Sequence, residues 1–174
     1  LEFSSDFLWG TAVSEFQVSG AENCPNSQWA DWESKGVPYI KNGGSSGKSA
    51  DHWNRYREDI QAMKNMGLNS FRFSIEWSAI EPQQGVINEA ALDHYKDVFN
   101  ALDDAKLTPM VTLYHFSHPK WFEDLGAFEK VENIQYFTRF CKLVFERFGD
   151  RSSLWCTMNE PSVIVLQGYM LGEF

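Results

Sequence analysis

Short apolar runs alternate with stretches of helical periodicity along the whole of this 174-residue chain. The runs lie at residues 7–13, 70–77, 110–115 and 155–159, and each has about the length of a strand. Between them, apolar residues recur every three or four positions, as they do on the buried face of a helix. Strands that alternate with helices usually form a parallel sheet joined by right-handed crossovers. The pattern therefore predicts an α/β fold with four parallel strands.

The three predicted helices carry start and stop signals. The first begins after Asp51 and ends before Gly67, where a left-handed C-terminal cap belongs. Asn88 is the predicted N-cap of the second helix, and Gly149 closes the third. Residues 14–49 are rich in glycine and proline and lack such periodicity, so we expect them to form a long loop.

Polar and apolar side chains alternate in the second run, residues 70–77. Arg72, Ser74 and Glu76 share one face, and only aromatic and aliphatic residues occupy the other. If helices cover the apolar face of a parallel sheet, the polar face lines an interior. A buried arginine near a buried glutamate predicts that Arg72 and Glu76 pair with each other or bind a ligand. Such a pair favours a structural role for Glu76 over a role as nucleophile.

A sheet of this kind can close in two ways. An open doubly wound sheet needs a glycine fingerprint at its first turn, and the chain has none. The run GGSSGKS at residues 43–49 is one residue short of a phosphate-binding loop, and no strand leads into it. A barrel has eight strands and about 250 residues. A chain of this length would then be half of a barrel.

The last apolar run ends in a carboxylate. Residues 154–161 read LWCTMNEP, so Glu160 follows a predicted strand that Pro161 prevents from continuing inside a sheet. Catalytic side chains of α/β barrels project from the C-terminal ends of strands. Position alone favours an exposed turn residue, because most glutamates are exposed. Glu160 is therefore a candidate acid whose role depends on the rest of the chain.

Charge and composition exclude several function classes. A net charge of -9 and a pI near 4.9 repel phosphate backbones and acidic lipids, so we expect no nucleic-acid or membrane partner. No apolar run is long enough to cross a bilayer, and the first residues lack a signal-peptide pattern. The three cysteines lack metal-type spacing and indicate free thiols in a reducing compartment. A cytoplasmic protein is therefore predicted.

Aromatic residues make up 16% of the chain and include 7 Trp, which is rich for a domain of this size. We expect most of these rings to lie in the core. Tryptophans in the predicted loop, such as Trp29 and Trp32, are the candidates for stacking on sugar rings. His115 and His118 could suggest a metal site, but no third ligand follows at a suitable spacing. We therefore predict neither a metal nor a cofactor.

Five segments carry a family resemblance along the whole chain. They read FLWGTAVSEFQVSGA, ADHWNRYREDI, SFRFSIEWSAIEP, MVTLYHF and TMNEP. In this order and spacing they resemble glycoside hydrolase family 1, the family of retaining β-glucosidases and β-galactosidases. The resemblance implies a (β/α)8 barrel of the TIM type, of which the chain supplies about the first four βα units. Residues 1–174 would be the N-terminal half of one glycoside hydrolase domain, acting on terminal β-D-glucosides or galactosides in small β-glycosides and oligosaccharides.

The resemblance also implies roles for single residues. Glu160 resembles the general acid and base of the family, and Asn159 resembles the group that binds the sugar 2-hydroxyl. Gln17 and His115 are similar to residues that bind hydroxyls of the glycone. Trp121 is similar to a residue on the aglycone side.

Arg72 resembles the cation that orients the family nucleophile. The nucleophile itself lies in an I/V-T-E-N-G motif late in the family barrel, and this motif does not occur in the chain. The chain also departs from the family pattern at Ser19, where many relatives have Glu, at Ala79, and at Ala127 and Phe128. None of these departures removes a residue with an assigned chemical role.

Two functions follow from the missing nucleophile. The chain is the N-terminal part of a β-glycosidase, with the remainder removed, on another chain or never encoded. The alternative is a catalytically incomplete half-barrel that binds sugar or serves as an assembly module. Four parallel strands leave two open edges, so we expect pairing with a complementary C-terminal half or self-association.

Overall fold

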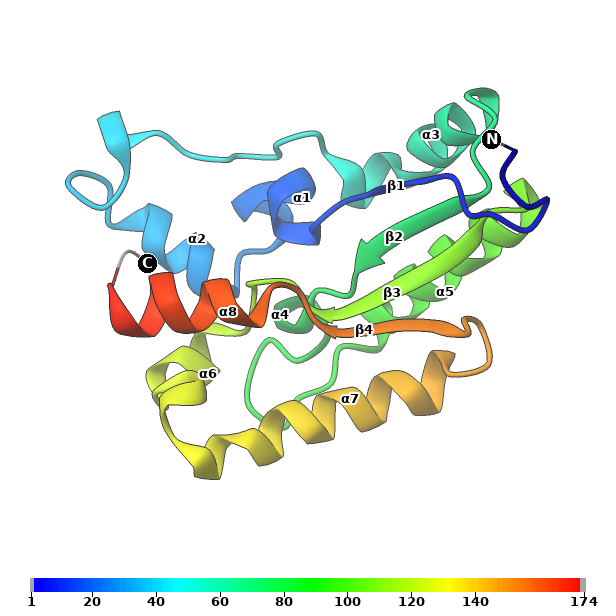
Figure 1. The fold of residues 1–174 in the computed structure, drawn as a ribbon. Coiled ribbons are helices and arrows are strands. Elements are labelled where there is room, and N and C mark those ends of the chain that lie inside the picture. Colours follow the sequence, from blue (N-terminus) through cyan, green and yellow to red (C-terminus); the bar gives the residue numbers. More distant parts are fainter. Residues whose placement is uncertain (1, 173–174) are drawn as a thin grey trace.

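The computed structural model describes residues 2–172 and contains one four-stranded parallel sheet (Figure 1). The strands are β1 (Gly10–Ala12), β2 (Ser70–Ser74), β3 (Thr108–Tyr114) and β4 (Leu154–Met158). Their order in the sheet is the order in the chain, so each strand pairs with the next one. The predicted parallel sheet is confirmed, and its order is that of consecutive strands in a (β/α)8 barrel.

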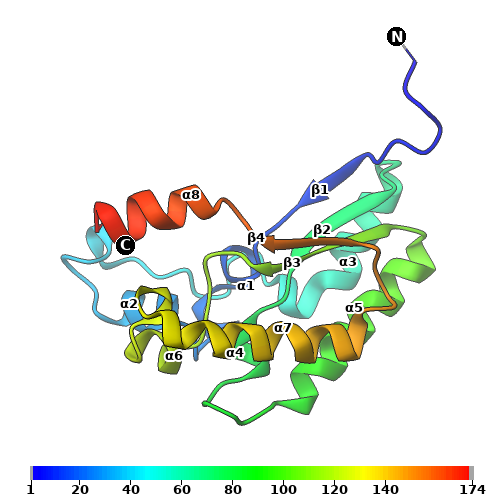
Figure 2. The same cartoon turned by 60° about the horizontal axis from the view of Figure 1, so that its bottom comes forward.

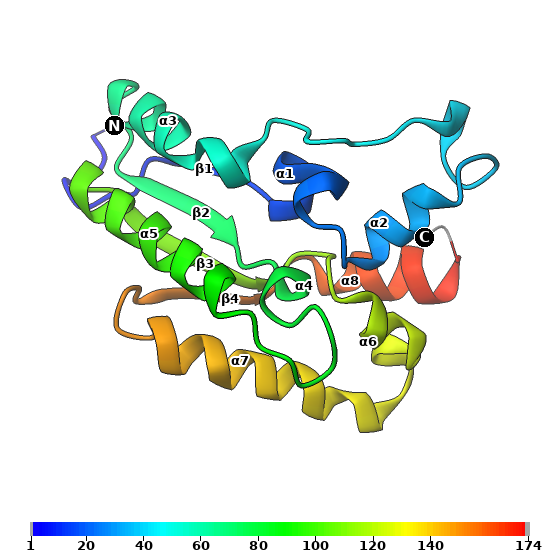
Figure 3. The same ribbon diagram turned by 180° about the vertical axis from the view of Figure 1, so that it is seen from behind.

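Three long helices cover one face of this sheet, as Figures 1 and 3 show from opposite sides. They are α3 (His52–Asn65), α5 (Glu89–Ala105) and α7 (Ile134–Phe148), and each connects two consecutive strands. The three predicted helices are therefore confirmed. The architecture is that of about half of a (β/α)8 barrel, with the outer helices in place.

The core fills the space between the sheet and these helices. Phe73 of β2 is 1% exposed, and its ring centroid lies 5.5 Å from that of Phe99 in α5. Trp77, also 1% exposed, stacks on Phe140 of α7 at 5.1 Å. Burial of each such side chain contributes roughly 1.5–3 kcal/mol to the free energy of unfolding. The aromatic content of the sequence is thus largely used to hold helices on the sheet.

Short helices gather at the C-terminal ends of the strands (Figure 2). They are α1 (Glu15–Asn23), α2 (Gln28–Ser34), η1 (Lys41–Gly43), α4 (Trp77–Ile80), α6 (Lys120–Asp124), η2 (Ala127–Glu129), η3 (Val131–Asn133) and α8 (Pro161–Val163). Helix α8 continues as the π-helix η4 (Ile164–Met170). None of the helices within residues 2–172 combines the length and apolar character needed to cross a membrane.

The long loop expected at residues 14–49 is wrong for its first part, up to Ser34, which contains α1 and α2. The buried side of α1 includes Glu15 and Ser19, so apolar periodicity could not reveal this helix. Helix α2 begins with Ser27 as N-cap, whose side chain accepts a hydrogen bond from the Ala30 amide. Serine is a preferred N-cap residue, so Ser27 could have indicated the start of this helix in the sequence.

Two predicted strands also differ from the structure in their bounds. Strand β1 is confined to Gly10–Ala12, and Trp9 before it is 49% exposed. Strand β2 stops at Ser74 because Glu76 caps α4, which starts at Trp77.

Candidate functional site

The C-terminal ends of the four strands lie side by side, because the strands are parallel and in sequence order. Arg72 of β2 extends across this edge. Its Nε donates to Thr112 Oγ1 of β3 at 2.9 Å, and its Nη2 donates to Asn159 Oδ1 after β4 at 2.8 Å. Nη2 also lies 3.6 Å from Cys156 Sγ. One guanidinium group therefore ties three strands together.

Asn159 is the second member of this group. It is 9% exposed, and its backbone amide donates to the Tyr114 carbonyl at 2.8 Å, which continues the β3–β4 pairing by one residue. Its side-chain oxygen accepts from Arg72, so the Nδ2 hydrogens are the donors that the amide can offer to a ligand. Arg72 thus fixes which end of the Asn159 amide is a donor site.

His115 lies beside these residues at the end of β3. Burial lowers the pKa of His115, the Arg72 cation lowers it further, and the Glu160 carboxylate opposes both. The imidazole is therefore neutral at pH 7. Its Nδ1 is buried and has no hydrogen-bond partner within residues 2–172. An unpaired buried nitrogen costs roughly 1–3 kcal/mol, so this atom is suited to bind a ligand hydroxyl.

Glu160 follows Asn159 directly and is exposed. Its backbone has φ 41° and ψ 61°, in the left-handed region that glycine favours, and Pro161 begins α8 after it. This conformation costs a residue with a side chain about 1–2 kcal/mol. Strained backbone of this kind concentrates at functional sites. The turn presents the Glu160 carboxyl at the edge where Arg72, His115 and Asn159 meet.

Gln17 and Trp121 are placed outside this group. Gln17 is an exposed residue of α1, the helix that follows β1, and its carbonyl accepts a hydrogen bond from Ser49 Oγ. Trp121 of α6 donates from Nε1 to the Glu81 carbonyl at 2.9 Å and packs edge-on against Trp77 at 5.8 Å. Trp121 is therefore held against the core by a contact that uses its only donor.

The expected pair between Arg72 and Glu76 is wrong. Glu76 is 1% exposed and accepts hydrogen bonds from Ser78 Oγ at 2.7 Å and Ser117 Oγ at 2.9 Å. Burial raises the pKa of this carboxyl, although the serine hydrogen bonds oppose it. The chain bends into α4 directly after β2, which carries Glu76 away from Arg72. Its role in the structure is that of a buried helix cap.

Sequence reasoning missed a second buried carboxyl, Glu15. It is 2% exposed, its backbone amide donates to Ser74 Oγ at 2.8 Å, and its carboxyl accepts a hydrogen bond from Ser19 Oγ. Burial raises the pKa of Glu15 to about 7, although His52 and Ser19 act in the opposite direction. The neighbouring Glu76 raises it too. No periodicity signals a carboxyl that is buried on a short polar helix.

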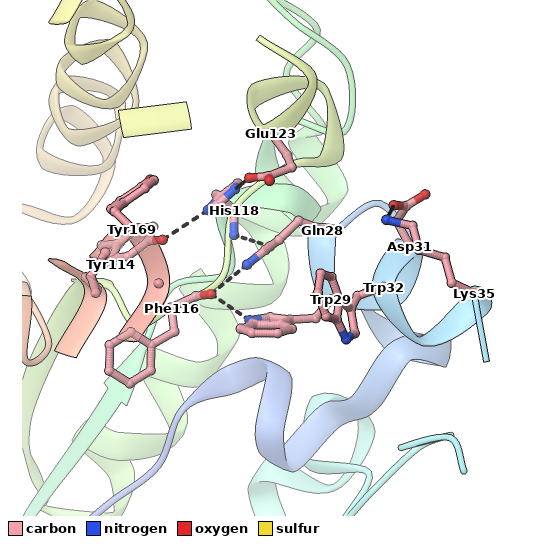
Figure 4. A pocket seen from close by; sticks show the side chains of 12 residues that line it. Gln28, Trp29, Asp31, Trp32, Lys35, Tyr114, Phe116, His118, Glu123 and Tyr169 are labelled. Carbon is pink, nitrogen blue, oxygen red and sulfur yellow. Dashed lines mark hydrogen bonds and ion pairs between the residues drawn. The ribbon is translucent and has the colours of Figure 1, made fainter. Parts of the chain in front are cut away.

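A separate cavity of about 140 Å³ lies between α2, the segment after β3 and η4 (Figure 4). Trp29, Trp32, Tyr114, His118 and Tyr169 are among its lining residues. Trp29 and Trp32, the tryptophans that we expected to stack on sugar rings, line this cavity. Arg72, His115, Asn159 and Glu160 do not line it. His118 therefore lines this cavity, whereas His115 lies with Arg72 and Glu160 at the ends of the strands.

A parallel βα sheet with a polar group at the carboxyl ends of its strands defines this chain as part of a (β/α)8 barrel. The family model described as "Glycosyl hydrolase family 1" matches residues 1–174. The chain belongs to this family.

Curated relatives agree with this assignment. The chain is 37% identical to β-glucosidase A from Acetivibrio thermocellus, over 99% of the chain and 39% of that protein. It is 41% identical to β-glucosidase 1B from Phanerodontia chrysosporium, over 98% of the chain and 33% of that protein. The chain thus spans between a third and two fifths of the length of these relatives.

Solved structures have the same fold. The β-glycosidase from Pyrococcus horikoshii matches with a TM-score of 0.91 and 38% identity, over 100% of this chain and 40% of that one. The β-glucosidase from Thermotoga maritima in complex with castanospermine matches with a TM-score of 0.92 and 34% identity, over 98% and 40% of the two chains.

Proposed function

We propose that this chain supplies the acid/base half of a retaining β-glycosidase site. The observation that supports it best is the Arg72–Asn159 contact at 2.8 Å, with His115 and the exposed Glu160 at the same edge of a family 1 half-barrel. The substrates would be terminal β-D-glucosides or galactosides, and residues 1–174 would form the N-terminal half of a single domain.

Hydrolysis with retention needs two carboxyl groups about 5–5.5 Å apart. In the proposed mechanism the Glu160 carboxyl protonates the glycosidic oxygen as it leaves, and the resulting carboxylate later removes a proton from the attacking water. The Asn159 Nδ2 group binds the sugar 2-hydroxyl. The unpaired Nδ1 of neutral His115 accepts a hydrogen bond from a hydroxyl of the glycone, and Gln17 serves the same sugar from α1.

The nucleophile is proposed to come from a complementary segment outside these 174 residues. Glu15 and Glu76, the two carboxyl groups near the ends of β1 and β2, are at most 2% exposed and bonded to serines. Arg72, whose cation is held in place by Thr112 and Asn159, would orient the incoming carboxylate. Trp121, whose indole N–H donates to the Glu81 carbonyl, is proposed to serve the aglycone side through its ring.

The second candidate is a half-barrel that binds sugar or assembles without catalysis. The buried state of Glu15 and Glu76 favours it for the chain on its own. A complementary C-terminal half is proposed as partner, because all three residues of β1 are exposed at the edge of the sheet. The proposed cytoplasmic location is supported by Cys24, Cys141 and Cys156, which are all free thiols.

A hybrid protein tests the catalytic proposal. Residues 1–174 are joined to the remaining part of the Acetivibrio thermocellus β-glucosidase A, and hydrolysis of cellobiose and p-nitrophenyl β-glucoside is measured. We expect turnover of both, and Glu160→Gln is expected to slow cellobiose hydrolysis by about 10²–10⁴-fold. The loss is expected to be smaller for p-nitrophenyl β-glucoside, whose leaving group needs less protonation.

The chain on its own is tested in the same assay. It should have the circular dichroism spectrum of an α/β fold and should not turn over p-nitrophenyl β-glucoside or β-galactoside. Turnover by the chain alone that Glu160→Gln abolishes would place a nucleophile within residues 1–174. A hybrid that keeps full activity on cellobiose after Glu160→Gln would contradict the proposed acid/base role.

A further inference from the structure

The inner face of the sheet carries a layer of small polar side chains below the proposed site. Ser74 of β2 pairs with Thr112 of β3, and Thr112 pairs with Cys156 of β4, so the three residues lie side by side. Arg72 shares the face of Ser74, because side chains two positions apart in a strand point the same way. Arg72 itself pairs with Met110, two residues before Thr112, so its guanidinium group reaches along the sheet toward the C-terminal ends of the strands.

Thr112 has the best supported position among the residues that contact this guanidinium group. It belongs to β3, which pairs with β2 on one side and with β4 on the other, and its carbonyl accepts from the Ile75 amide at 3.1 Å. Its side chain is 0% exposed, and a β-branched side chain has few rotamers. Cys156 lies on the edge strand β4, and Asn159 follows that strand. The Thr112 hydroxyl is thus a fixed acceptor for Arg72.

The contacts of Arg72 use two of the three nitrogens of its guanidinium group. Nε donates to Thr112 Oγ1 at 2.9 Å, and Nη2 donates to Asn159 Oδ1 at 2.8 Å and lies 3.6 Å from Cys156 Sγ. Within residues 2–172, Nη1 makes no hydrogen bond and Arg72 forms no ion pair. A partly buried cation is expected to have an anionic partner. Nη1 is therefore the donor that remains for a carboxylate.

The planarity of the guanidinium group makes the contact at Nε decisive. The three nitrogens lie in one plane, so two contacts at different nitrogens fix the direction of the third. Asn159 alone would hold the group at Nη2 and allow it to pivot about that contact. The Thr112 hydroxyl removes this freedom, because it holds the group at Nε as well. The direction of Nη1 thus depends on Thr112.

We propose that Thr112 is a positioning residue of the glycosidase site. Its hydroxyl holds the Arg72 guanidinium group in the orientation in which Nη1 donates to the nucleophile carboxylate that the complementary segment supplies. This inference rests on the proposed function and adds a residue that acts on the reaction through Arg72. Thr112 has no contact with the sugar in this role, since its side chain is fully buried below the guanidinium group.

The positioning role has a signature in the pH dependence of the reaction. A nearby cation favours the ionised form of a carboxyl group, so a well placed Arg72 holds the pKa of the nucleophile below its usual range. A displaced guanidinium group does this less well, so the acidic limb of the pH–activity profile moves to higher pH. His115 and Glu160, the other titratable groups at this edge, are the same in every variant. A threonine with a purely structural role would change stability and leave this limb in place.

The first measurement uses the chain on its own and follows the exchange of the Arg72 Nε hydrogen with solvent by NMR. Thr112→Val keeps the shape of the side chain without the hydroxyl and should accelerate this exchange at least about tenfold. Thr112→Ser keeps the acceptor and should stay within about threefold of the wild type. Thr108→Val, at the opposite end of β3, is the matched control and should leave the exchange unchanged. Equal exchange in the wild type and Thr112→Val would overturn the proposal.

The second measurement uses the hybrid with the remaining part of the Acetivibrio thermocellus β-glucosidase A. Thr112→Val should lower kcat on cellobiose by about 10–100-fold and change KM by less than about threefold. It should also move the acidic limb of the pH profile up by about half a pH unit or more. Thr112→Ser should restore both the rate and the limb, and Thr108→Val should behave like the wild type.

The outcomes separate this inference from the proposed function. An active hybrid in which folded Thr112→Val keeps its kcat and its acidic limb would overturn the positioning role. If Thr112→Val does not fold, Thr112→Ala, which leaves room for water beside Nε, takes its place in both measurements. An inactive wild-type hybrid would contradict the proposed function, and the exchange of the Nε hydrogen would still decide whether Thr112 holds Arg72.

Discussion

Arg72 connects the proposed site to the sheet at the level of single residues. The alternation of residues 70–77 correctly predicts that it faces the interior, but the partner that sequence suggested, Glu76, is wrong. Its partners Thr112 and Asn159 lie 40 and 87 positions away along the chain. Such contacts depend on how neighbouring strands align, and the sequence of one strand does not contain this information. The strand pattern could therefore predict the face on which Arg72 lies, but not its hydrogen-bond partners.

Arg72→Lys tests this connection. A lysine has a single ammonium group and cannot reproduce the planar fork that reaches Thr112 and Asn159 together. We expect the free energy of unfolding to fall by about 1–3 kcal/mol, measured by urea denaturation. Arg57→Lys, on a side chain that is 60% exposed, is the matched control and should change stability by less than about 0.5 kcal/mol. Equal effects of the two substitutions would contradict the role given to Arg72.

Glu15 should make stability depend on pH near neutrality. Its pKa is raised from 4.5 to about 7 in the folded chain, mainly by burial, so folding favours the protonated carboxyl. This contribution to the free energy of unfolding is complete below pH 4.5 and is lost as the pH rises through about 7. Glu15→Gln remains uncharged, so between about pH 5 and pH 8 it should gain roughly 2–3 kcal/mol relative to the wild type.

Denaturant unfolding of wild type and Glu15→Gln at both pH values checks this prediction. Glu22→Gln, at an exposed position of the same helix, should follow the wild type at both values. A stability difference between wild type and Glu15→Gln that stays constant with pH would show that the carboxyl does not titrate in this range.

At the scale of elements, the regular units were predictable and the short helices were not. Helices α3, α5 and α7 each bury one apolar side against the sheet, so their periodicity is visible in the sequence. Helix α1 buries Glu15 and Ser19, and α2 has no fully buried residue, so neither carries an apolar stripe. Helix α2 has a serine N-cap, and both helices are held by contacts with distant segments, such as the Glu15 amide on Ser74 Oγ and Trp29 Nε1 on the Phe116 carbonyl. Apolar spacing cannot reveal such contacts.

Ser27→Ala is expected to loosen α2. The Ser27 hydroxyl is fully buried, accepts from the Ala30 amide at 3.1 Å and donates to the Cys24 carbonyl at 2.9 Å. Its loss should lower the free energy of unfolding by about 1–2 kcal/mol. It should also accelerate amide exchange in α2, measured by hydrogen–deuterium exchange. Ser34→Ala, which removes an exposed hydroxyl from the other end of α2, should have little effect, and equal exchange in both variants would contradict the prediction.

The fold of the whole molecule was predictable from the alternation of apolar runs and helical stripes, whereas the closure of the barrel was not. Four strands in sequence order are what the pattern indicates. Within residues 2–172, β1 and β4 are the two edges of the sheet, and each pairs with one strand only. Large apolar side chains are also exposed near both ends of the described chain. Phe3 is 60% exposed and Met170 is 71% exposed. These surfaces support an assembly with a complementary half.

The chain on its own should therefore self-associate. Unpaired strand edges and exposed apolar side chains favour contacts between copies. Sedimentation velocity of the purified chain at micromolar concentration should show species heavier than the 20.1 kDa monomer. The hybrid with a complementary half should sediment as a smaller set of species, because its edges are paired. A monodisperse monomer of the chain alone would contradict this expectation.

The order β1-β2-β3-β4 also has a kinetic consequence. Each strand pairs with the strand that precedes it in the chain, so a nascent polypeptide leaving the ribosome can add one βα unit at a time to a sheet that already exists. Each pairing joins consecutive βα units, so its loop-closure cost is smaller than that of a contact between units far apart in the chain. Synthesis proceeds at about 5–20 residues per second, so each unit has seconds to order before the next one is complete. The strands that have already paired are thus suited to act as the template on which each new strand adds.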